Sequence, residues 1–411
     1  IRNVAREYRK RRIPCDVMYL DIDYMDRYRV FTWNSRTFPD PEGFLYDLHK
    51  EGFRVVCIVD PGVAKMEEEN EWKNCMECDR PKSKDREDYH AFDIGMATKG
   101  FFLRHGNGRL ITETVWPGVV FMPDFTRPEN RALWGEWQAE ALLDKGISGI
   151  WNDMNEPAVF AKTSFTQDFP ADAVHDDFGQ FRTHARVHNI YGMTMAQASC
   201  EGQFKHRPEQ RPFTLTRSGW AGIQRYSAVW TGDNQSSFAS MRLDFQLNLS
   251  MSMSGTSFVG CDIGGFAGNA GAELMSRWFE WGVFQPFCRA HSAWGTLDHE
   301  PWARGPEVEL VARRMVEVRY QLLPYLYTHF VESCETGLPV NRPMALEFPG
   351  DATVAPIGDQ VMIGPDLMLA PILEAGKLHR ALYLPAGDWV HFWSGERLQG
   401  GKWHLADAPH G

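Results

Sequence analysis

The sequence predicts an α/β protein built on a (β/α)₈ TIM barrel with loop insertions, followed by the start of a C-terminal β-sandwich. Short apolar runs recur without the strict alternation of half-exposed strands, as expected of parallel strands buried on both faces. Most of these runs are followed by a stretch with helical spacing. Beyond about residue 340 the chain changes to short β-type runs separated by Gly and Pro turns.

The predicted barrel strands are eight runs at residues 17–23, 54–62, 119–125, 147–157, 212–218, 226–233, 257–265 and 286–291. Eight such runs with intervening helices favour a barrel over a doubly wound sheet. The fifth and sixth runs depart from the pattern, because the seven residues between them are too few for a helix. We expect helices over residues 41–51 and 130–145, each ended by a glycine.

The domain organisation follows from these patterns. Residues 1–335 are predicted to form the barrel, and residues 336–411 a partial C-terminal β-sandwich. Segments 64–116 and 158–186 are too long for simple connections and are interpreted as insertions on the catalytic face. Because the chain starts at Ile1 without Met or a signal peptide, we expect it to be cut from a longer protein.

Composition narrows the classes of function. The chain has a net charge of −11, and its short basic cluster at residues 9–12 is expected to be a solvated helix face. No nucleic-acid partner is therefore predicted. No stretch approaches the roughly 18–20 apolar residues that span a bilayer. The fifteen Trp and twenty-six Phe residues favour a carbohydrate site, since aromatic faces stack on sugar rings.

The cysteines predict neither a disulfide framework nor a metal site. All eight are scattered, and Cys75 and Cys78 form a lone C-x-x-C motif without the second ligand pair that zinc requires. We therefore expect reduced cysteines, no metal and a cytoplasmic location.

Polar residues end nearly every predicted strand, and strand ends meet at one mouth of a parallel barrel. They are Asp21, Asp23, Asp60, Asp124, Asp153, Arg217, Asp233, Asp262 and His291. The aromatic residues that flank them are Trp116, Trp151, Trp230, Phe266 and Trp294. A single Asp at a strand end is ordinarily a cap or turn residue. Many polar residues that converge at one mouth, together with aromatic rings, indicate a site for a neutral, polyhydroxylated ligand.

Other chemistries lack their motifs. The sequence contains neither G-x-G-x-x-G nor G-x-S-x-G, so neither a dinucleotide site nor a serine nucleophile is predicted. No cofactor is expected.

The segment GIWNDMNEP at residues 149–157 carries two carboxylates, Asp153 and Glu156. Glycosidic cleavage with retention needs two carboxyl groups about 5–5.5 Å apart on opposite sides of the anomeric centre. Two carboxylates three residues apart on one strand end would not straddle a sugar. A partner on another strand is therefore expected, with Asp21, Asp233 and Asp262 as the candidates.

The sequence resembles glycoside hydrolase family 31, the α-glucosidase family, along nearly its whole length. The motifs that carry this resemblance occur in the family's order: DIDYMD (21–26), VWPG (115–118), FMPDF (121–125), WNDMNEP (151–157), LTRSGWAGIQRY (215–226), WTGDN (230–234), GCDIGGF (260–266) and FCRAHS (287–292). Members normally also carry an N-terminal β-sandwich domain, which is absent from this chain.

The resemblance implies roles for individual residues. Asp153 matches the nucleophile that forms a covalent glucosyl intermediate, and Asp233 matches the general acid/base. The residues that would hold sugar hydroxyls in the −1 subsite are Asp21, Arg217, Asp262 and His291. The residues that would form its apolar walls are Ile58, Trp116, Trp151, Met154, Trp230 and Phe266.

Physical expectations accompany these roles. Trp230 and a closed pocket would desolvate Asp233 and raise its pKa, so that it remains protonated near neutral pH. Arg217 would keep Asp153 ionised. Glu156 is expected to support the site by hydrogen bonding near the strand end, so that Asp153 is oriented.

The function predicted from the resemblance is that of a retaining α-glucosidase acting on terminal α-linked glucose of oligosaccharides. An α-transglucosylase or α-glucan lyase using the same site is the alternative, and a non-catalytic sugar-binding protein is a remote one. Linkage preference depends on residues of the two insertions. A homo-oligomer is possible on this sequence, which does not specify the oligomeric state.

Overall fold

The computed structural model describes residues 1–66, 89–160 and 167–411, which form two compact units. Unit 1 consists of residues 1–5 and 15–228, and unit 2 of residues 6–14 and 229–411. The predicted boundary near residue 335 remains a prediction. Cys75 and Cys78 lie outside the described residues.

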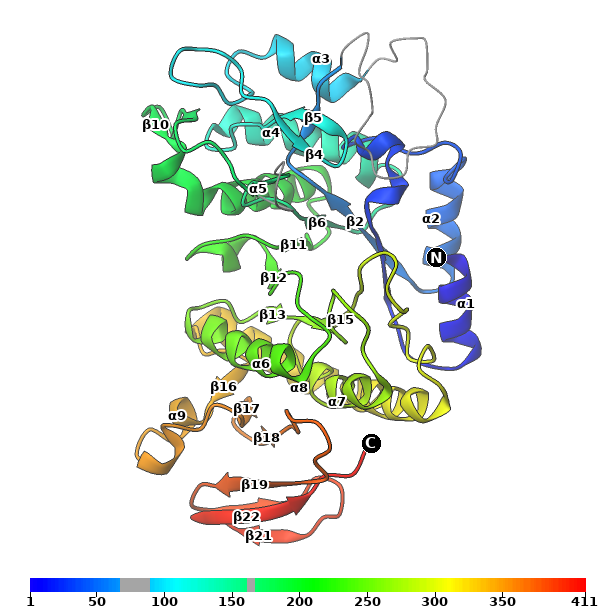
Figure 1. The fold of residues 1–411 in the computed structure, drawn as a ribbon, viewed down its shortest axis with the longest axis vertical. Coiled ribbons are helices and arrows are strands. Elements are labelled where there is room, and N and C mark those ends of the chain that lie inside the picture. The colour runs from blue at the N-terminus through cyan, green and yellow to red at the C-terminus, as the bar shows by residue number, and fades with distance from the viewer. Residues whose placement is uncertain (67–88, 161–166) are drawn as a thin grey trace. The chain divides into compact units, whose positions relative to one another are not determined.

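A parallel sheet forms the centre of unit 1 (Figure 1). Its strands, in spatial order, are β1 (Val17–Leu20), β2 (Arg54–Val59), β6 (Gly149–Asn152) and β11 (Thr214–Thr216). Every residue of β6 and β11 is buried, as are five of the six residues of β2. Burial on both faces explains why these runs lack alternation.

Helices α2 (Pro41–Lys50) and α5 (His184–His206) pack on this sheet, and α4 (Pro128–Gln138) packs against α5. The predicted helix at 41–51 is confirmed, because the Asp40 side chain caps α2 and Phe44, Leu45 and Leu48 are buried on it. The helix predicted at 130–145 begins at Pro128 and continues into the π-helical turn η3 (Ala139–Leu143).

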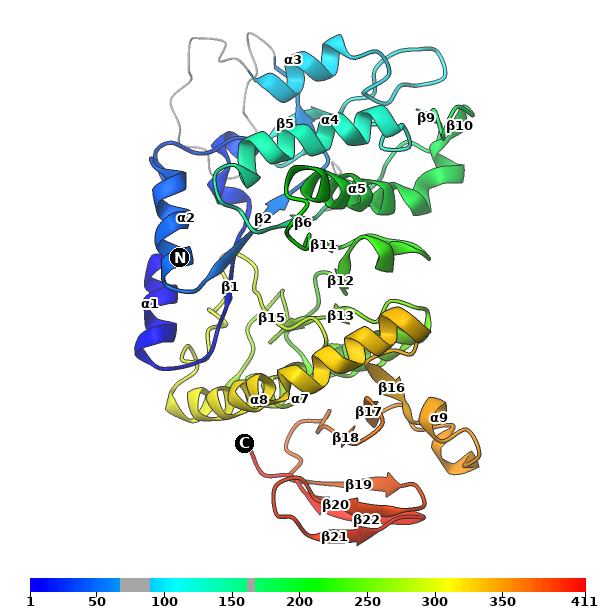
Figure 2. The same ribbon diagram turned by 180° about the vertical axis from the view of Figure 1, so that it is seen from behind.

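Helices α4 and α5 lie side by side in Figures 1 and 2. They approach closely at two glycines: a Cβ atom added to Gly135 would lie 2.8 Å from the Cα atom of Gly202. Helix α5 also contacts β6 and β11, so this pair of helices supports the two strands that precede Asp153 and Arg217.

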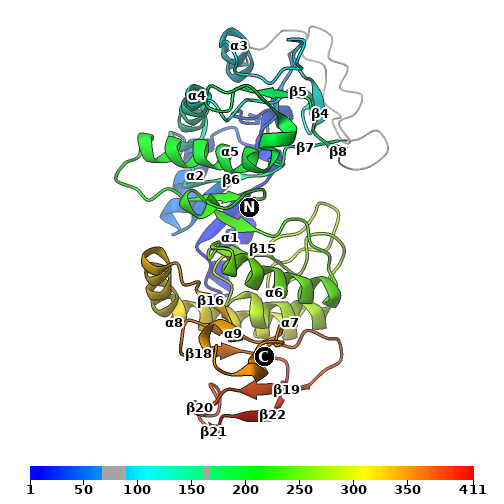
Figure 3. The same ribbon diagram turned by 90° about the vertical axis from the view of Figure 1, so that its left-hand side faces the viewer.

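The prediction that residues 119–125 form the third barrel strand is wrong. Strand β5 (Gly118–Phe121) pairs antiparallel with β3 (Val63–Ala64) and β4 (Glu113–Val115), while β2 pairs directly with β6. The reason is the two-residue turn Trp116-Pro117, closed by Gly118 at φ +93°, which folds the run back as a hairpin. Figure 3 shows this hairpin beside β7 (Ala158–Val159) and β8 (Gln167–Asp168).

The remaining elements of unit 1 are short, apart from a first helix shared between the units. They are α1 (Arg2–Lys10), η1 (Ile22–Tyr24), η2 (Asp26–Tyr28), α3 (His90–Ala97), β9 (Val174–His175), β10 (Arg182–Thr183) and η4 (Ile223–Arg225).

Unit 2 contains two parallel strand pairs. The first is β12 (Ala228–Trp230) with β13 (Val259–Gly260), and the second is β14 (Asp262–Ile263) with β15 (Arg289–Ala290). The helices that pack with them are α6 (Phe238–Met253), α7 (Ala272–Gly282) and α8 (Pro306–Thr336). Helices α7 and α8 run side by side (Figure 2) and supply much of the core of this unit.

After α8 the chain forms antiparallel strands, as the sequence predicts. A three-stranded sheet contains β16 (Asn341–Pro343), β17 (Val361–Ile363) and β18 (Leu367–Leu369). Two further pairs are β19 (His379–Leu384) with β22 (Lys402–Asp407), and β20 (Asp388–Val390) with β21 (Arg397–Gln399). Two short helical turns, α9 (Met344–Glu347) and η5 (Ala352–Val354), lie between β16 and β17. Within the described residues, no helix is long and apolar enough to span a membrane.

Candidate active site

The strand register of unit 1 places three site residues in a row. Val59 of β2 is paired with Asn152 of β6, and Asn152 with Thr216 of β11. The next residues along these strands are Asp60, Asp153 and Arg217. Because neighbouring strands are about 4.8 Å apart and aligned residues share a face, these three side chains emerge together at the carboxyl end of the sheet.

Arg217 binds both carboxylates of the GIWNDMNEP segment. Its Nη1 lies 3.1 Å from Oδ1 of Asp153, and its Nε and Nη2 donate hydrogen bonds of 3.0 Å to the two carboxylate oxygens of Glu156. The Asp153 and Arg217 side chains are only 14% and 15% exposed. One partly buried guanidinium thus fixes Asp153, while Glu156 fixes the guanidinium, which is the geometry of a supporting residue.

Asn155 is a positioning residue that the sequence analysis missed. Its side-chain amide donates to Oγ1 of Thr216 at 2.8 Å, and its carbonyl oxygen accepts from the backbone N–H of Ser218 at 3.1 Å. Thr216 and Ser218 flank Arg217, so this buried amide ties the end of β6 to the segment that carries the arginine. The available signal was its place within WNDMNEP.

Met154, Trp151 and Ile58 were predicted to line the sugar site, and all three are buried. Met154 has φ +54°, which is unusual for a residue other than glycine, and its Sδ accepts a 3.2 Å contact from Arg217. Strained backbone of this kind clusters at functional sites. The role of these residues as apolar walls remains a prediction.

Trp116 and Asp21 lie closer to solvent. Trp116 forms part of the β4–β5 turn, with its ring edge-on to Phe160 at 5.0 Å between centroids. Asp21 is exposed, and its Oδ1 accepts from the backbone N–H of Ile22 at 2.7 Å, capping η1.

Asp60 and Asp124 were both expected at the rim, and both are nearly fully buried. Oδ1 of Asp60 has no hydrogen-bond partner in the described part of the chain. Burial, reinforced by the charge of Asp153, raises the pKa of Asp60 well above its ordinary value, although Arg217 opposes this shift.

The prediction that Asp124 lies at the rim of the barrel mouth is wrong. Burial tends to raise its pKa, but hydrogen bonds from His175, Thr126 and the backbone of Asp176 outweigh burial and lower the pKa. The contacts from His175 and Asp176, at 3.2 and 2.8 Å, attach the 158–186 insertion to the segment after β5. The side chain therefore fastens a loop, because β5, the strand before Asp124, belongs to the antiparallel side sheet and not to the barrel sheet.

In unit 2 the strand register creates a second arginine–carboxylate pair. Asp262 of β14 is paired with Arg289 of β15, and Nε and Nη2 of the arginine lie 3.1 and 2.8 Å from Oδ1 of the aspartate. Burial raises the pKa of Asp262 to about 7, against the opposing effect of Arg289. Arg289 was missed by the sequence analysis, although it lies in FCRAHS, two residues before His291.

Asp233 is exposed, so the expected desolvation of this carboxyl by Trp230 is wrong. The Trp230 ring is buried and faces Arg289, whose Cζ lies 5.2 Å from the ring centroid. Asn234, a third residue missed by the sequence analysis, follows Asp233 directly. Its side chain bonds Asp244 at 2.8 Å and the Asp262 carbonyl at 3.1 Å.

Phe266 and His291 lie together in unit 2, with ring centroids 5.2 Å apart. Asn234 also fixes Phe266, by accepting its backbone N–H at 2.8 Å. Burial and the neighbouring Arg289 hold the pKa of His291 well below its ordinary value, so this imidazole is neutral near pH 7. Trp294, in contrast, is 82% exposed.

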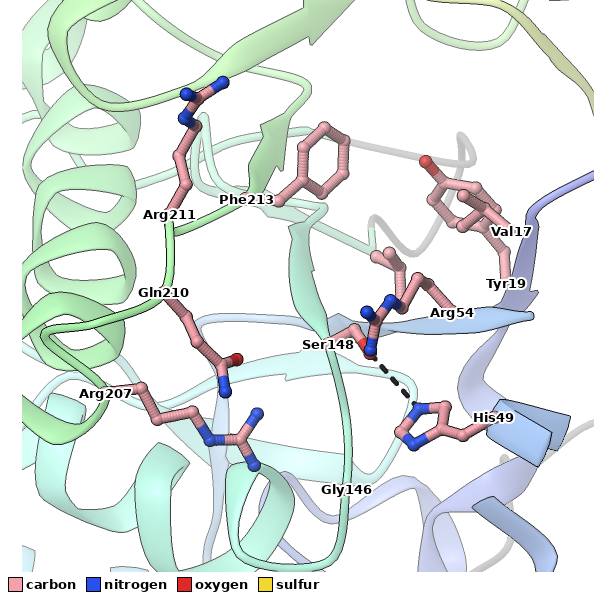
Figure 4. A pocket seen from close by; sticks show the side chains of 11 residues that line it. Val17, Tyr19, His49, Arg54, Gly146, Ser148, Arg207, Gln210, Arg211 and Phe213 are labelled. Carbon is pink, nitrogen blue, oxygen red and sulfur yellow. Dashed lines mark hydrogen bonds between the residues drawn. The ribbon is translucent and has the colours of Figure 1, made fainter. Parts of the chain in front are cut away.

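A cavity of about 780 Å³ in unit 1 lies at the opposite end of the strands (Figure 4). Val17, Arg54, Ser148 and Phe213 line it at or just before the starts of their strands, and Ser148 contacts His49 at 3.3 Å. None of the predicted site residues lines this cavity. Since parallel barrels carry their chemistry at the carboxyl ends of the strands, the candidate site is the cluster around Asp153.

The described residues contain no group of three or more His, Cys, Asp or Glu side chains arranged to hold a metal. Carboxylates held by arginines, neutral imidazole and buried aromatic rings are suited to orienting hydroxyl groups and to nucleophilic attack by a carboxylate.

Comparison with known proteins gives consistent matches. The family model of the glycosyl hydrolases family 31 TIM-barrel domain matches residues 1–329, and that of the glycosyl hydrolase family 31 C-terminal domain matches residues 337–411. Alpha-glucosidase 2 of Bacillus thermoamyloliquefaciens is 40% identical over 99% of this chain and 49% of its own length.

Two solved structures extend the comparison. The Flavobacterium johnsoniae GH31 dextranase complexed with glucose has a TM-score of 0.84 and 32% identity, over 99% of this chain and 48% of its own. A GH31 alpha-xylosidase from a soil metagenome, complexed with xylose, has a TM-score of 0.85 and 30% identity, over 99% of this chain and 59% of its own.

The chain spans about half the length of the curated relatives it matches. The barrel match confirms the predicted (β/α)₈ fold class, even though one predicted strand lies in a side sheet. The chain belongs to glycoside hydrolase family 31.

Proposed function

We propose that the protein of which this chain is part is a retaining α-glucosidase that releases terminal α-linked glucose from oligosaccharides. The observation that carries the proposal is Asp153, held by Arg217 at the carboxyl end of a central strand in a chain of this family. Glucose is favoured because curated relatives are named α-glucosidases, including one that is 40% identical.

The proposed reaction has two steps. In the first, a carboxylate oxygen of Asp153 forms a bond to the anomeric carbon, the glycosidic C–O bond breaks, and Asp233 gives its proton to the departing oxygen. In the second, Asp233 takes a proton from water, the water oxygen bonds to the anomeric carbon, and the ester bond to Asp153 breaks. The anomeric configuration is retained because it is inverted twice.

Each role has support within its own unit. The Arg217 guanidinium favours the anionic form of Asp153 that attack requires. Asp233 is exposed and is followed by the anchored Asn234, so it can exchange protons with water between the two steps. Neutral His291 and the capped Asp21 are assigned to sugar hydroxyls, and buried Trp151 and Trp230 to the apolar walls.

A cytoplasmic location is also proposed, because Cys57, Cys200 and Cys261 are thiols rather than disulfides.

The test is hydrolysis of p-nitrophenyl α-glucoside by the full-length protein, with the released anomer followed by NMR. The expected product is α-glucose, with activity lost in Asp153→Ala. Release of β-glucose, or undiminished activity in that variant, would overturn the proposal. Longer oligosaccharides would instead indicate a transglucosylase, and an anhydro-sugar a lyase.

A further inference from the structure

Asp60 is a buried carboxyl group that the proposed reaction does not use. It follows β2 directly, and the register that pairs Val59 with Asn152 places it opposite Asp153 on the neighbouring strand. The residue is 3% exposed, and its Oδ1 lacks a hydrogen-bond partner in the described part of the chain.

The charge around Asp60 is unbalanced. Its ionisable neighbours come from the segments after β1, β6 and β11; they are Asp21, Tyr24, Asp153, Glu156 and Arg217, and Tyr24 in turn interacts with Cys57 of β2. Four carboxyl groups therefore share one guanidinium, which forms ion pairs with Asp153 and Glu156. Burial raises the pKa of Tyr24 and Cys57, which keeps both uncharged.

Two carboxylates on adjacent strands cannot both ionise without a large cost in a buried site. Of the pair, Asp153 has the cation and Asp60 has an orphaned oxygen. We propose that Asp60 carries a proton in the folded protein and acts as a neutral positioning residue beside Asp153. The positioning role of Asp60 rests on the proposed function, because it requires Asp153 to be the nucleophile. The protonation of Asp60 does not depend on that function.

A neutral Asp60 has two consequences for the nucleophile. It leaves the charge of Arg217 to Asp153 and Glu156, and it adds no repulsion to the anion that attacks. The raised pKa of Asp60, caused first by burial and then by Asp153, agrees with this arrangement. No proton leaves Asp60 in either step of the reaction.

The first test is the pH dependence of unfolding in the full chain and in Asp60→Asn. A folded-state pKa above the unfolded value means that stability from this group is present at low pH and is lost as pH rises from about 4. The ratio of unfolding constants, wild type over variant, should therefore rise with pH by up to about tenfold per unit.

The matched control is Asp124→Asn, an equally buried aspartate whose pKa is lowered. The stabilising contribution of Asp124 should be present above about pH 4 and lost as pH falls further. The ratio of unfolding constants, wild type over Asp124→Asn, should therefore fall as pH rises, opposite to the ratio for Asp60→Asn. A ratio for Asp60→Asn that does not change with pH, or that changes in the direction of Asp124→Asn, would overturn the proposal.

The second test measures the coupling to Asp153 without relying on catalysis. Near neutral pH, the infrared carbonyl band of protonated carboxylic acids should lose the contribution of one carboxyl group in Asp60→Asn, while Asp262, whose pKa is about 7, still contributes to the band. In Asp153→Asn the contribution of Asp60 should disappear at lower pH, because the neighbouring charge is gone. A band unaffected by either substitution contradicts the proposal, even if Asp60→Asn unfolds.

These measurements separate the two claims. If the band and the pH dependence are found but no α-glucoside is cleaved, the proposed function fails while Asp60 remains a protonated group. If cleavage occurs without them, the proposed function stands and the role of Asp60 fails.

Discussion

Each unit of the chain contains an arginine held against a carboxylate on neighbouring parallel strands, directly after β6 and β11 in unit 1 and at the start of β14 and β15 in unit 2, and the two pairs differ in exposure. Arg217 is shared between Asp153 and Glu156, with side chains 14–35% exposed. Arg289 forms an ion pair with Asp262, with side chains 4% and 0% exposed. The first cluster keeps a route to solvent, whereas the second is sealed.

The difference in exposure indicates that the two clusters have different roles. A carboxylate that attacks a sugar must be oriented yet reachable, and sharing one guanidinium with Glu156 orients Asp153 without enclosing it. A sealed pair on adjacent strands instead fixes the two strands, since losing either partner leaves an uncompensated buried charge. The comparison therefore predicts that the Arg217 cluster determines turnover and the Arg289 pair determines stability.

The largest effect is expected for Asp153→Asn. Removing the nucleophile should lower kcat on the order of 10⁴-fold or more, while the fold is retained because the amide is isosteric. Steady-state hydrolysis of an aryl α-glucoside measures the loss. Asp16→Asn, an exposed aspartate before β1, is the control. Comparable activity in the two variants would remove Asp153 from the chemistry.

Replacing each arginine by methionine tests whether the two clusters contribute differently to the free energy of unfolding. Arg289→Met should lower the free energy of unfolding by about 3–5 kcal/mol, because Asp262 is left buried without its cation. Arg217→Met should cost only about 1–2 kcal/mol, because its carboxylates keep access to water. Urea denaturation measures both. Equal losses would show that the difference in exposure has no energetic meaning.

The two clusters should also differ in pH dependence. Because the folded pKa of Asp262 is raised from 3.8 to about 7, the stability that it contributes is present below about pH 4 and declines as pH rises to about 7. The ratio of unfolding constants, wild type over Asp262→Asn, should therefore rise across this window. A ratio that falls with rising pH would contradict the raised pKa.

The smallest effect is expected for Glu156→Gln. The amide can still accept from Arg217 but loses its charge, so kcat should fall roughly tenfold through poorer orientation of Asp153. The fold should be preserved. A loss as large as that in Asp153→Asn, with the fold intact, would mean that Glu156 takes part in the reaction itself.

Much of the fold could be predicted because buried parallel strands leave an unbroken apolar signature, as in RVVCIV before Asp60. The exception was the run at 119–125, whose apolar residues fit a barrel strand equally well. The turn Trp116-Pro117-Gly118 decided its pairing, and turn chemistry has to be weighed against hydrophobicity to see this.

The candidate site was predictable where a residue type performs chemistry, and less so where it only supports it. Asp153 and Arg217 end strands that the pattern identifies, and the register brings them together. Asn155 and Asn234 were missed because a buried amide acts through partners distant in sequence, such as Thr216 and Asp262. The burial of Asp60 and the exposure of Asp233 likewise depend on tertiary packing.

The most direct test of the account is to trap the covalent intermediate. The full-length protein would be incubated with a 5-fluoro-α-glucosyl fluoride, whose good leaving group and slowed hydrolysis let the ester accumulate, and the labelled peptide identified by mass spectrometry. The account predicts one glucosyl label per chain, on Asp153 within the GIWNDMNEP segment. A label on any other carboxylate would contradict the central claim.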